Sequence, residues 1–365
     1  MLAESHPLIR RTLRFLALPY CYVKLVNWQE CTLPKSQVLK DLLYIFFKLK
    51  YFPDNYSPCR LWEKDKTEWY FYYGSSYHPY QRSKLRKEVQ KFEYIYLFDN
   101  KEISELICRG IGVKLPKYYG AIWPEMNYRK KIEETVYKNE RKKIIIKPIM
   151  GQEGKDISLA YVEDGQVKVK LQEYDINLSD FHLKERSIMQ EVVVQDSRVA
   201  KISSSSVNTI RAVTLYTKSN EAIVISSIMR FGVGKAYIDN WSAGGVAVGV
   251  DHEKGELMKT AYDKKGKQYV KHPTTGVTFE GFRIPHWGKV LKLAKDVQEA
   301  CSFFKMLGLD IGISLEGPIL IEVNPNPDII LQEQAASPLL KHKGIYEEFE
   351  KYDLFVNKFQ RNLYK

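Results

Sequence analysis

The sequence predicts an α+β fold, in which an N-terminal domain rich in helices and aromatic residues precedes helices that alternate with strands. Helical spacing and a dense aromatic cluster, including Trp62 and Trp69, set residues 1–98 apart from the rest. From Asn100 onward, apolar runs of strand length alternate with helical patterns. The expected parts are an N-terminal domain (1–98), a linker with a first α+β subdomain (99–193), a second subdomain (194–340) and a C-terminal helix (341–365).

Apolar spacing predicts the N-terminal helices. Over Ser36 to Tyr51, Val38, Leu42 and Phe46 recur at helical intervals, and Ser36 is the candidate cap. A second helical pattern covers Ser83 to Tyr96. For the tyrosine cluster, an aromatic core is favoured over a surface that stacks on sugar rings.

Beyond residue 100, the pattern predicts a short helix over Lys101 to Arg109 and a long amphipathic helix over Trp287 to Leu307 that Gly308 ends. Between these helices, the apolar runs of strand length are Lys142–Pro148, Ile157–Val162, Ile188–Gln195, Thr209–Thr217 and Ala222–Phe231.

A strand hairpin follows the long helix. Its strands are Leu309 to Leu315 and Ile319 to Val323, joined by Glu316-Gly317-Pro318. A three-residue loop would pair Leu315 with Ile319 and Asp310 with Asn324. A two-residue loop would put Asp310 opposite Val323 and scatter the polar side chains.

The three-residue loop places Asp310, Glu322 and Asn324 on one face of the hairpin. Carboxylates and an amide oxygen are hard donors, which suit Mg²⁺ with a nucleotide better than zinc. The alternative is that Asp310 and Glu322 are exposed charges at strand ends.

Composition narrows the class of protein. The chain has 365 residues, 44% of them apolar, and a net charge of +12, which favours anionic partners. Nucleic acid is disfavoured because the lysines are dispersed and no nucleic-acid module accompanies them. Five widely spaced cysteines without a CxxC pair favour a reducing cytoplasm over a disulfide framework or a zinc site. Leu8 to Val26 could form a basic helix that lies on the inner face of a membrane, or it could pack on its own domain.

A glycine loop follows the strand that contains Lys147. The backbone N–H groups at Gly151 and Gly154 could approach phosphate oxygens, because glycine has no side chain to obstruct them. The spacing is not that of a Walker A loop, and Gly232-Val233-Gly234 lacks the third glycine of a dinucleotide fingerprint. A plain glycine turn between two strands is the alternative.

The order of the motifs from about residue 98 to 335 resembles the ATP-grasp superfamily. The motifs are Lys147-Pro148, Gln190-Glu191, Asn208-Thr209-Ile210-Arg211, Arg230, Asn240 with Gly244-Gly245, and Asp310, Glu322 and Asn324. They are most similar to the sugar-transfer associated branch, and the segment from Arg230 to Gly245 also resembles the RimK-like glutamate-ligase branch. The resemblance implies an ATP-grasp fold, with two α+β subdomains that clasp ATP and residues 99–193 as the lid.

The resemblance also implies which residues hold the nucleotide. Lys101 and Lys147 match the two lysines that contact phosphates, with Gly151 to Gly154 as the flap above them. Gln190 to Val193 match the hinge, in which backbone groups of Glu191 and Val193 bond adenine. Asp196 is the candidate for the ribose contact, with Gln195 and Ser197 as the other options.

The remaining matches concern the reaction. Arg211 and Arg230 would face the γ-phosphate and an acyl phosphate. Asn240, with Gly244 and Gly245, would contact phosphate or substrate. Asp310, Glu322 and Asn324 would bind one or two Mg²⁺ ions. His272 could orient an acceptor or act as a base, although packing of its loop is favoured.

The activity that the resemblance implies is an ADP-forming acid–amine ligase. Its partners would be ATP and small-molecule or glycan-linked carboxylate and amine substrates, with a sugar-linked acid or amino acid in surface polysaccharide biosynthesis as the expected setting. The alternatives are an ATP-grasp kinase that phosphorylates a hydroxyl and a non-catalytic protein that binds nucleotide or glycan. The residues do not specify the two substrates, the oligomeric state or the role of the N-terminal domain.

Overall fold

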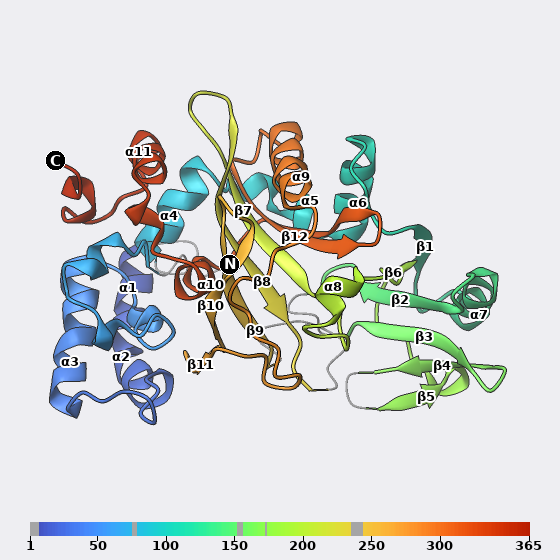
Figure 1. The fold of residues 1–365 in the computed structure, drawn as a ribbon. Coiled ribbons are helices and arrows are strands. Elements are labelled where there is room, and N and C mark those ends of the chain that lie inside the picture. Colours follow the sequence, from blue (N-terminus) through green and yellow to red (C-terminus); the bar gives the residue numbers. More distant parts are fainter. Residues whose placement is uncertain (1–6, 75–78, 152–155, 172–173, 235–243) are drawn as a thin grey trace.

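The computed structural model describes residues 7–74, 79–151, 156–171, 174–234 and 244–365. Two antiparallel sheets lie side by side in its centre and right, and the N-terminal helices lie at the left (Figure 1). The α+β class is therefore confirmed.

The N-terminal helices are α1 (Pro7–Leu16), α2 (Leu18–Tyr20) and α3 (Lys35–Tyr44). The predicted helix over Ser36 to Tyr51 needs correction at its start and along its length. Pro34 is the cap, and α3 changes at Ile45 to a π-helical turn that ends before Lys50, whose φ is +66°. The second predicted helix, Ser83 to Tyr96, is divided into α4 (Pro79–Glu88), a 3₁₀ turn (Phe92–Tyr94) and α5 (Ile95–Asp99).

The first sheet has six antiparallel strands in the order β1-β6-β2-β3-β4-β5. The strands are β1 (Tyr118–Ile122), β2 (Lys143–Pro148), β3 (Ser158–Glu163), β4 (Gln166–Lys170), β5 (Asp175–Asn177) and β6 (Ser187–Glu191). Helix α7 (Tyr128–Lys138) covers one face, where Ile132 and Val136 pack on Ile144 and Ile146 of β2.

The second sheet has seven antiparallel strands in the order β11-β10-β9-β8-β7-β12-β13. The strands are β7 (Thr209–Tyr216), β8 (Ala222–Phe231), β9 (Val246–Asp251), β10 (Glu256–Tyr262), β11 (Gln268–Tyr269), β12 (Met306–Ser314) and β13 (Gly317–Asn324). Helices α5, α6 (Lys101–Gly110) and α9 (Trp287–Ala300) pack with this sheet, and α10 (Ile329–Ala335) contacts β8, β9 and β10.

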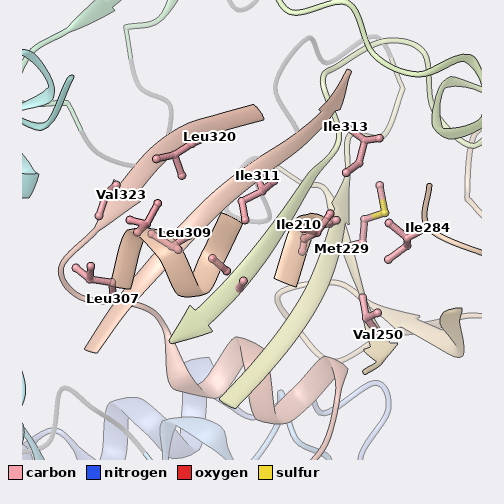
Figure 2. Packing of buried hydrophobic residues seen from close by; sticks show 14 of the residues in the cluster. Ile210, Met229, Val250, Ile284, Leu307, Leu309, Ile311, Ile313, Leu320 and Val323 are labelled. Atoms are coloured by element: carbon pink, nitrogen blue, oxygen red, sulfur yellow. The ribbon is translucent and has the colours of Figure 1, made fainter. Parts of the chain in front are cut away.

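One face of the second sheet forms the largest core cluster. Leu309, Ile311 and Ile313 of β12 gather there with Leu320 and Val323 of β13 (Figure 2). Because side chains alternate along a strand, Asp310 projects to the opposite face.

The long predicted helix, Trp287 to Leu307, is too long. Helix α9 ends at Ala300, and Leu307 and Gly308 belong to β12. Gly308 is not a helix stop: a Cβ at this position would lie 2.8 Å from the Cβ of Pro327, so glycine allows the chain after β13 to pack closely. The predicted C-terminal helix is also shorter, since α11 covers only Lys343–Lys351.

The hairpin register differs from both options considered for the sequence. Ser314 pairs with Gly317, so the loop is Leu315-Glu316, and a bulge at Ile321 then brings Asp310 opposite Glu322. Asn324 pairs with Gly308. The bulge restores the common face for Asp310, Glu322 and Asn324 that a regular two-residue hairpin would have lost.

A buried carboxylate joins the N-terminal region to α10. Glu333 accepts hydrogen bonds from the backbone N–H groups of Tyr73 at 2.7 Å, Gly74 at 3.3 Å and Leu339 at 3.2 Å. Burial raises the pKa of Glu333 to about 8 despite these donors. The folded protein therefore holds this proton more tightly than the unfolded chain does.

We expect this carboxylate to make stability fall as the pH rises from 4.5 to about 8, because ionisation costs more in the folded state over that window. Glu333→Gln, which cannot ionise, should reduce the fall in melting temperature between these limits. Parallel thermal melts across the window test the prediction, with the exposed Glu347→Gln on α11 as the control. Equal pH slopes for the wild type and Glu333→Gln would contradict it.

Candidate active site

A cleft lies between the two sheets; its volume is about 390 Å³ when the space open to solvent is included. The six-stranded sheet contributes Lys147, Ile188 and Gln190 to its lining, and β13 contributes Leu320 to Val323. The other lining residues come from α5, α6 and the segment after it: Phe98, Lys101, Ser104, Glu105, Cys108 and Leu115. Four residues singled out in the sequence, Lys101, Lys147, Gln190 and Glu322, thus line one cleft.

Lys101 joins three parts of the site. It is the first residue of α6, whose N-cap Asn100 accepts hydrogen bonds from the N–H groups of Glu102 and Ile103. Its Nζ lies 3.2 Å from Oε1 of Glu322 and donates to the carbonyl of Gly151. Lys101 therefore ties the start of the glycine loop to the strand that carries the candidate metal ligands.

Lys147 enters the cleft from β2. Two residues later, the backbone N–H of Ile149 donates a hydrogen bond to the carbonyl of Arg186. Burial lowers the pKa of its ammonium group; Glu322 opposes this shift, and Lys101 adds to it. Lys147 is a partly desolvated cation beside a second cation, and an anion bound there would relieve both the desolvation and the repulsion. The chemistry of the cleft therefore suits phosphate.

Gln190 and Glu105 form a buried pair at the cleft. Nε2 of Gln190 donates to Oε2 of Glu105 at 2.8 Å, and Arg109 pairs with the same carboxylate. Oε1 of Gln190 is buried without a partner in the described ranges, so an acceptor is available for a donor on a bound molecule. Glu105 was not singled out in the sequence, although it lies four residues after Lys101 and hence on the same helix face.

Glu191 and Val193, which the sequence matched to a nucleotide hinge, follow Gln190 at the end of β6. The backbone N–H of Glu191 donates to the carbonyl of Lys117 at 2.8 Å, and Val193 lies half-buried in the connection to α8 (Ser197–Ala200).

Asp196 caps α8, where its carboxylate accepts from the backbone of Arg198 at 2.8 Å and pairs with that guanidinium. The hydrogen bond from Arg198 lowers the pKa of Asp196 against the opposing effect of burial. Asp196 acts as the N-cap of α8 and does not line the cleft.

Asp310 lies at the centre of a buried charge cluster, on the face of the second sheet opposite the largest core cluster. Arg211, its cross-strand neighbour on β7, holds both carboxylate oxygens, with Nη2 at 2.9 Å from Oδ2. Arg230 on β8 lies 3.0 Å from Oδ2 and also donates to Thr209 Oγ1 at 2.6 Å. Burial acts to raise the pKa of Asp310, but the two guanidinium groups outweigh it and hold that pKa below its ordinary value.

The hairpin ligands fit Mg²⁺ in the chemistry of their donors. Asp310 and Glu322 are cross-strand neighbours, and Asn324 follows Glu322 on the same face. Over the residues that the structure describes, no three His, Cys, Asp or Glu side chains gather as a metal cage. A set of two carboxylates and one amide suits Mg²⁺ that takes its other oxygens from water and phosphate.

Other candidates lie elsewhere or outside the described residues. Asn240 and Gly154 fall in ranges that are not described, whereas Gly151 starts the glycine loop and Gly244 precedes β9 with a φ of +93°. His272 is buried, with Nε2 at 2.9 Å from the Gly232 carbonyl and Nδ1 at 3.1 Å from Thr275 Oγ1. These contacts agree with the packing role that the sequence favoured.

Weak similarities to solved structures accompany this geometry. D-alanine–D-alanine ligase from Bacillus anthracis is 14% identical, with a TM-score of 0.39, and the match covers 70% of this chain and 68% of that one. VanG D-Ala:D-Ser ligase from Enterococcus faecalis is 15% identical, with a TM-score of 0.40, and the match covers 72% of this chain and 62% of that one. An N5-carboxyaminoimidazole ribonucleotide synthetase is 11% identical, with a TM-score of 0.39. The match covers 66% of this chain and 52% of that one, so this chain spans about half of that protein.

A search of curated proteins found no match. The family model described as sugar-transfer associated ATP-grasp matches residues 80–349, which contain both sheets, the cleft and the Asp310 cluster. Because this match covers most of the chain, the protein belongs to the sugar-transfer associated ATP-grasp family.

Proposed function

We propose that this ATP-grasp enzyme is an ADP-forming ligase that joins a carboxylate to an amine through an acyl phosphate. The observation that carries the proposal is the distribution of charge: Lys101 and Lys147 line the cleft, and Arg211 and Arg230 converge on Asp310 beside it. Cations fixed in advance around a reacting phosphoryl group stabilise charge that develops in the transition state. The expected substrate is a sugar-linked acid or an amino acid in surface polysaccharide biosynthesis.

In this proposal the cleft holds ATP, with the base near Gln190 and the hinge residues Glu191 and Val193. Lys101 and Lys147 bind the phosphates below the loop that starts at Gly151. Asp310, Glu322 and Asn324 would hold one or two Mg²⁺ ions, which would supply positive charge to the phosphate oxygens. Asn240, Gly244 and Asp196 remain candidates for contacts to substrate or ribose.

Arg211 and Arg230 position the carboxylate and the γ-phosphoryl group for transfer. A carboxylate oxygen forms a bond to the γ-phosphorus, and the bond from that phosphorus to the bridging oxygen breaks to release ADP. The amine nitrogen then bonds to the acyl carbon. The bond from that carbon to the bridging oxygen breaks, phosphate leaves with this oxygen, and a proton from the amine passes to the phosphate. Planar guanidinium groups match both the carboxylate and the phosphate in this sequence of steps.

The decisive experiment is trapping of the intermediate with hydroxylamine. Candidate uronic acids and amino acids are screened for carboxylate-dependent ADP release, and hydroxylamine then replaces the amine. We expect a hydroxamate in equal amount to ADP and phosphate. A stable phosphorylated alcohol would favour the kinase alternative, and AMP with pyrophosphate would overturn the proposal. Nucleotide binding without any turnover across the screen would favour the non-catalytic alternative.

We expect Glu322→Gln to raise the Mg²⁺ concentration required for half-maximal turnover by about tenfold or more, since a hard cation loses a charged donor. Magnesium titrations of ADP release measure the effect. Glu316→Gln is the matched control, because Glu316 lies in the turn of the same hairpin and pairs only with Lys114 among its described ion-pair partners. An unchanged titration for Glu322→Gln would remove Glu322 from the metal site.

A further inference from the structure

The N-terminal helices carry an exposed apolar stripe that the proposed reaction does not use. Ile9, Leu13, Leu16, Tyr20 and Val23 follow one another at intervals of four and three residues, so they lie along one face of the nearly continuous helical segment from α1 through α2 to Leu25. Their exposed fractions lie between 57% and 67%. We call these five residues the N-terminal stripe.

The opposite face of the same segment is packed in the N-terminal core. Leu18, Cys21 and Val26 are buried there, and Arg11 lies against the ring of Phe46. The segment is therefore anchored to its domain, and the outward direction of the N-terminal stripe is fixed by that packing. Contiguous exposed apolar surface of this kind marks an interaction site.

The apolar surface extends beyond the stripe. Phe15 and Phe47 are each about half exposed, and their ring centroids lie 5.9 Å apart. Leu8 on α1 is 62% exposed. Together these side chains widen the apolar face well beyond the narrow seam of a two-helix coiled coil.

The charges around this face identify its partner. Residues 7–29 contain Arg10, Arg11, Arg14 and Lys24 but no aspartate or glutamate. Lys24 is exposed and lies one helical turn after Tyr20 of the stripe, and Lys48 is exposed directly after Phe47. Arg11 and Arg14 lie against the rings of Phe46 and Phe52 on the packed face, so Lys24 and Lys48 supply the exposed basic charge described for this face. A second copy of residues 7–29 would bring no acidic side chain to meet this charge, whereas an anionic surface would complement it.

We infer that the N-terminal stripe docks on the surface of an anionic lipid bilayer, with the helix parallel to the membrane plane. Within the described ranges, no helix has the length and apolarity needed to cross a bilayer, so the contact would be peripheral. Aromatic and leucine side chains enter the boundary between headgroups and acyl chains, while the basic residues attract anionic headgroups. This surface is independent of the cleft and of the proposed reaction.

The test is sedimentation of the full chain with vesicles of phosphatidylcholine alone and of equal parts phosphatidylcholine and phosphatidylglycerol. We expect binding to the anionic vesicles and much weaker binding to the neutral ones. The double variant Leu13→Glu with Leu16→Glu should lower partitioning at least about tenfold. Lys24→Gln should lower it about fivefold, which corresponds to roughly 1 kcal/mol per basic residue near the surface.

Val270→Glu is the matched control, because Val270 is an exposed apolar residue on another part of the molecule. It should bind vesicles as the wild type does, and ATP turnover without vesicles should be unchanged in every variant. Failure of the wild type to bind anionic vesicles, or equal binding by the double variant, would overturn the inference. A dimer that the double variant abolishes would also overturn it, by showing that a second copy covers the stripe.

Discussion

Lys147→Ala is expected to lower ATP turnover at least about a hundredfold, the scale on which the loss of one fixed transition-state donor is felt. The ammonium group lies in the cleft next to Lys101 and Glu322, and burial already lowers its pKa. A bound phosphate would compensate for that desolvation. The attraction between phosphate and the Lys147 ammonium group would therefore contribute to both binding and reaction. ADP release under saturating substrate is the measurement.

The same substitution should not lower the melting temperature, because the variant loses a desolvated charge rather than a favourable contact. Lys143→Ala is the matched control: Lys143 is the first residue of the same strand and does not line the cleft. ADP release by Lys147→Ala at the wild-type rate would exclude Lys147 from the site. A large fall in melting temperature would show instead that Lys147 holds the two sheets together.

Local patterns predicted the strands that build the site. Strand β8 has the predicted limits, Ala222 to Phe231, and β7 differs only at its last residue. Both strands are long and almost wholly buried, so their apolar runs stand out clearly. The sequence signal failed for α9, because Phe304 and Leu307 continue its apolar spacing into a turn and a strand.

The register of the hairpin could not be predicted from local patterns. The loop is one residue shorter than expected, and the bulge at Ile321 compensates for the change. A bulge adds a residue without altering the apolar composition of the strand, and Ile321 fits an apolar run equally well in either register. The prediction that three polar side chains share one face was therefore confirmed, although the predicted partner of Asp310 was wrong.

Contacts between distant segments account for most of what the sequence missed. Thr209 lies two residues before Arg211, yet its role is to hold Arg230 from the neighbouring strand. Glu105 accepts a hydrogen bond from the side chain of Gln190, which is 85 residues away in the sequence. Such pairs depend on which strands and helices become neighbours, and residue spacing along one element does not contain that information.

The largest revision concerns Asp310. From the sequence, Asp310 was expected either to bind Mg²⁺ or to be an exposed charge at the end of a strand. In the structure, the carboxylate is buried and pairs with both Arg211 and Arg230, which are themselves mostly buried. A metal ion at Asp310 would compete with guanidinium groups for the same oxygens, so the carboxylate has a structural role before any nucleotide binds.

We therefore expect Asp310→Asn to lower the free energy of unfolding by about 3 kcal/mol or more at neutral pH, since it removes the negative charge of a buried carboxylate that contacts both guanidinium groups. Folding lowers the pKa of Asp310 below its ordinary value of 3.8. The ionised carboxylate therefore stabilises the fold fully at a pH above 3.8, and this stabilisation is lost as the pH falls through the pKa of the folded state. Urea unfolding at neutral and acid pH should show the difference between wild type and variant shrinking in acid. Asp296→Asn is the control: its exposed pair with Lys292 should contribute less than about 1 kcal/mol. If Asp310→Asn costs no more than this control, the two arginines do not depend on Asp310 for their burial.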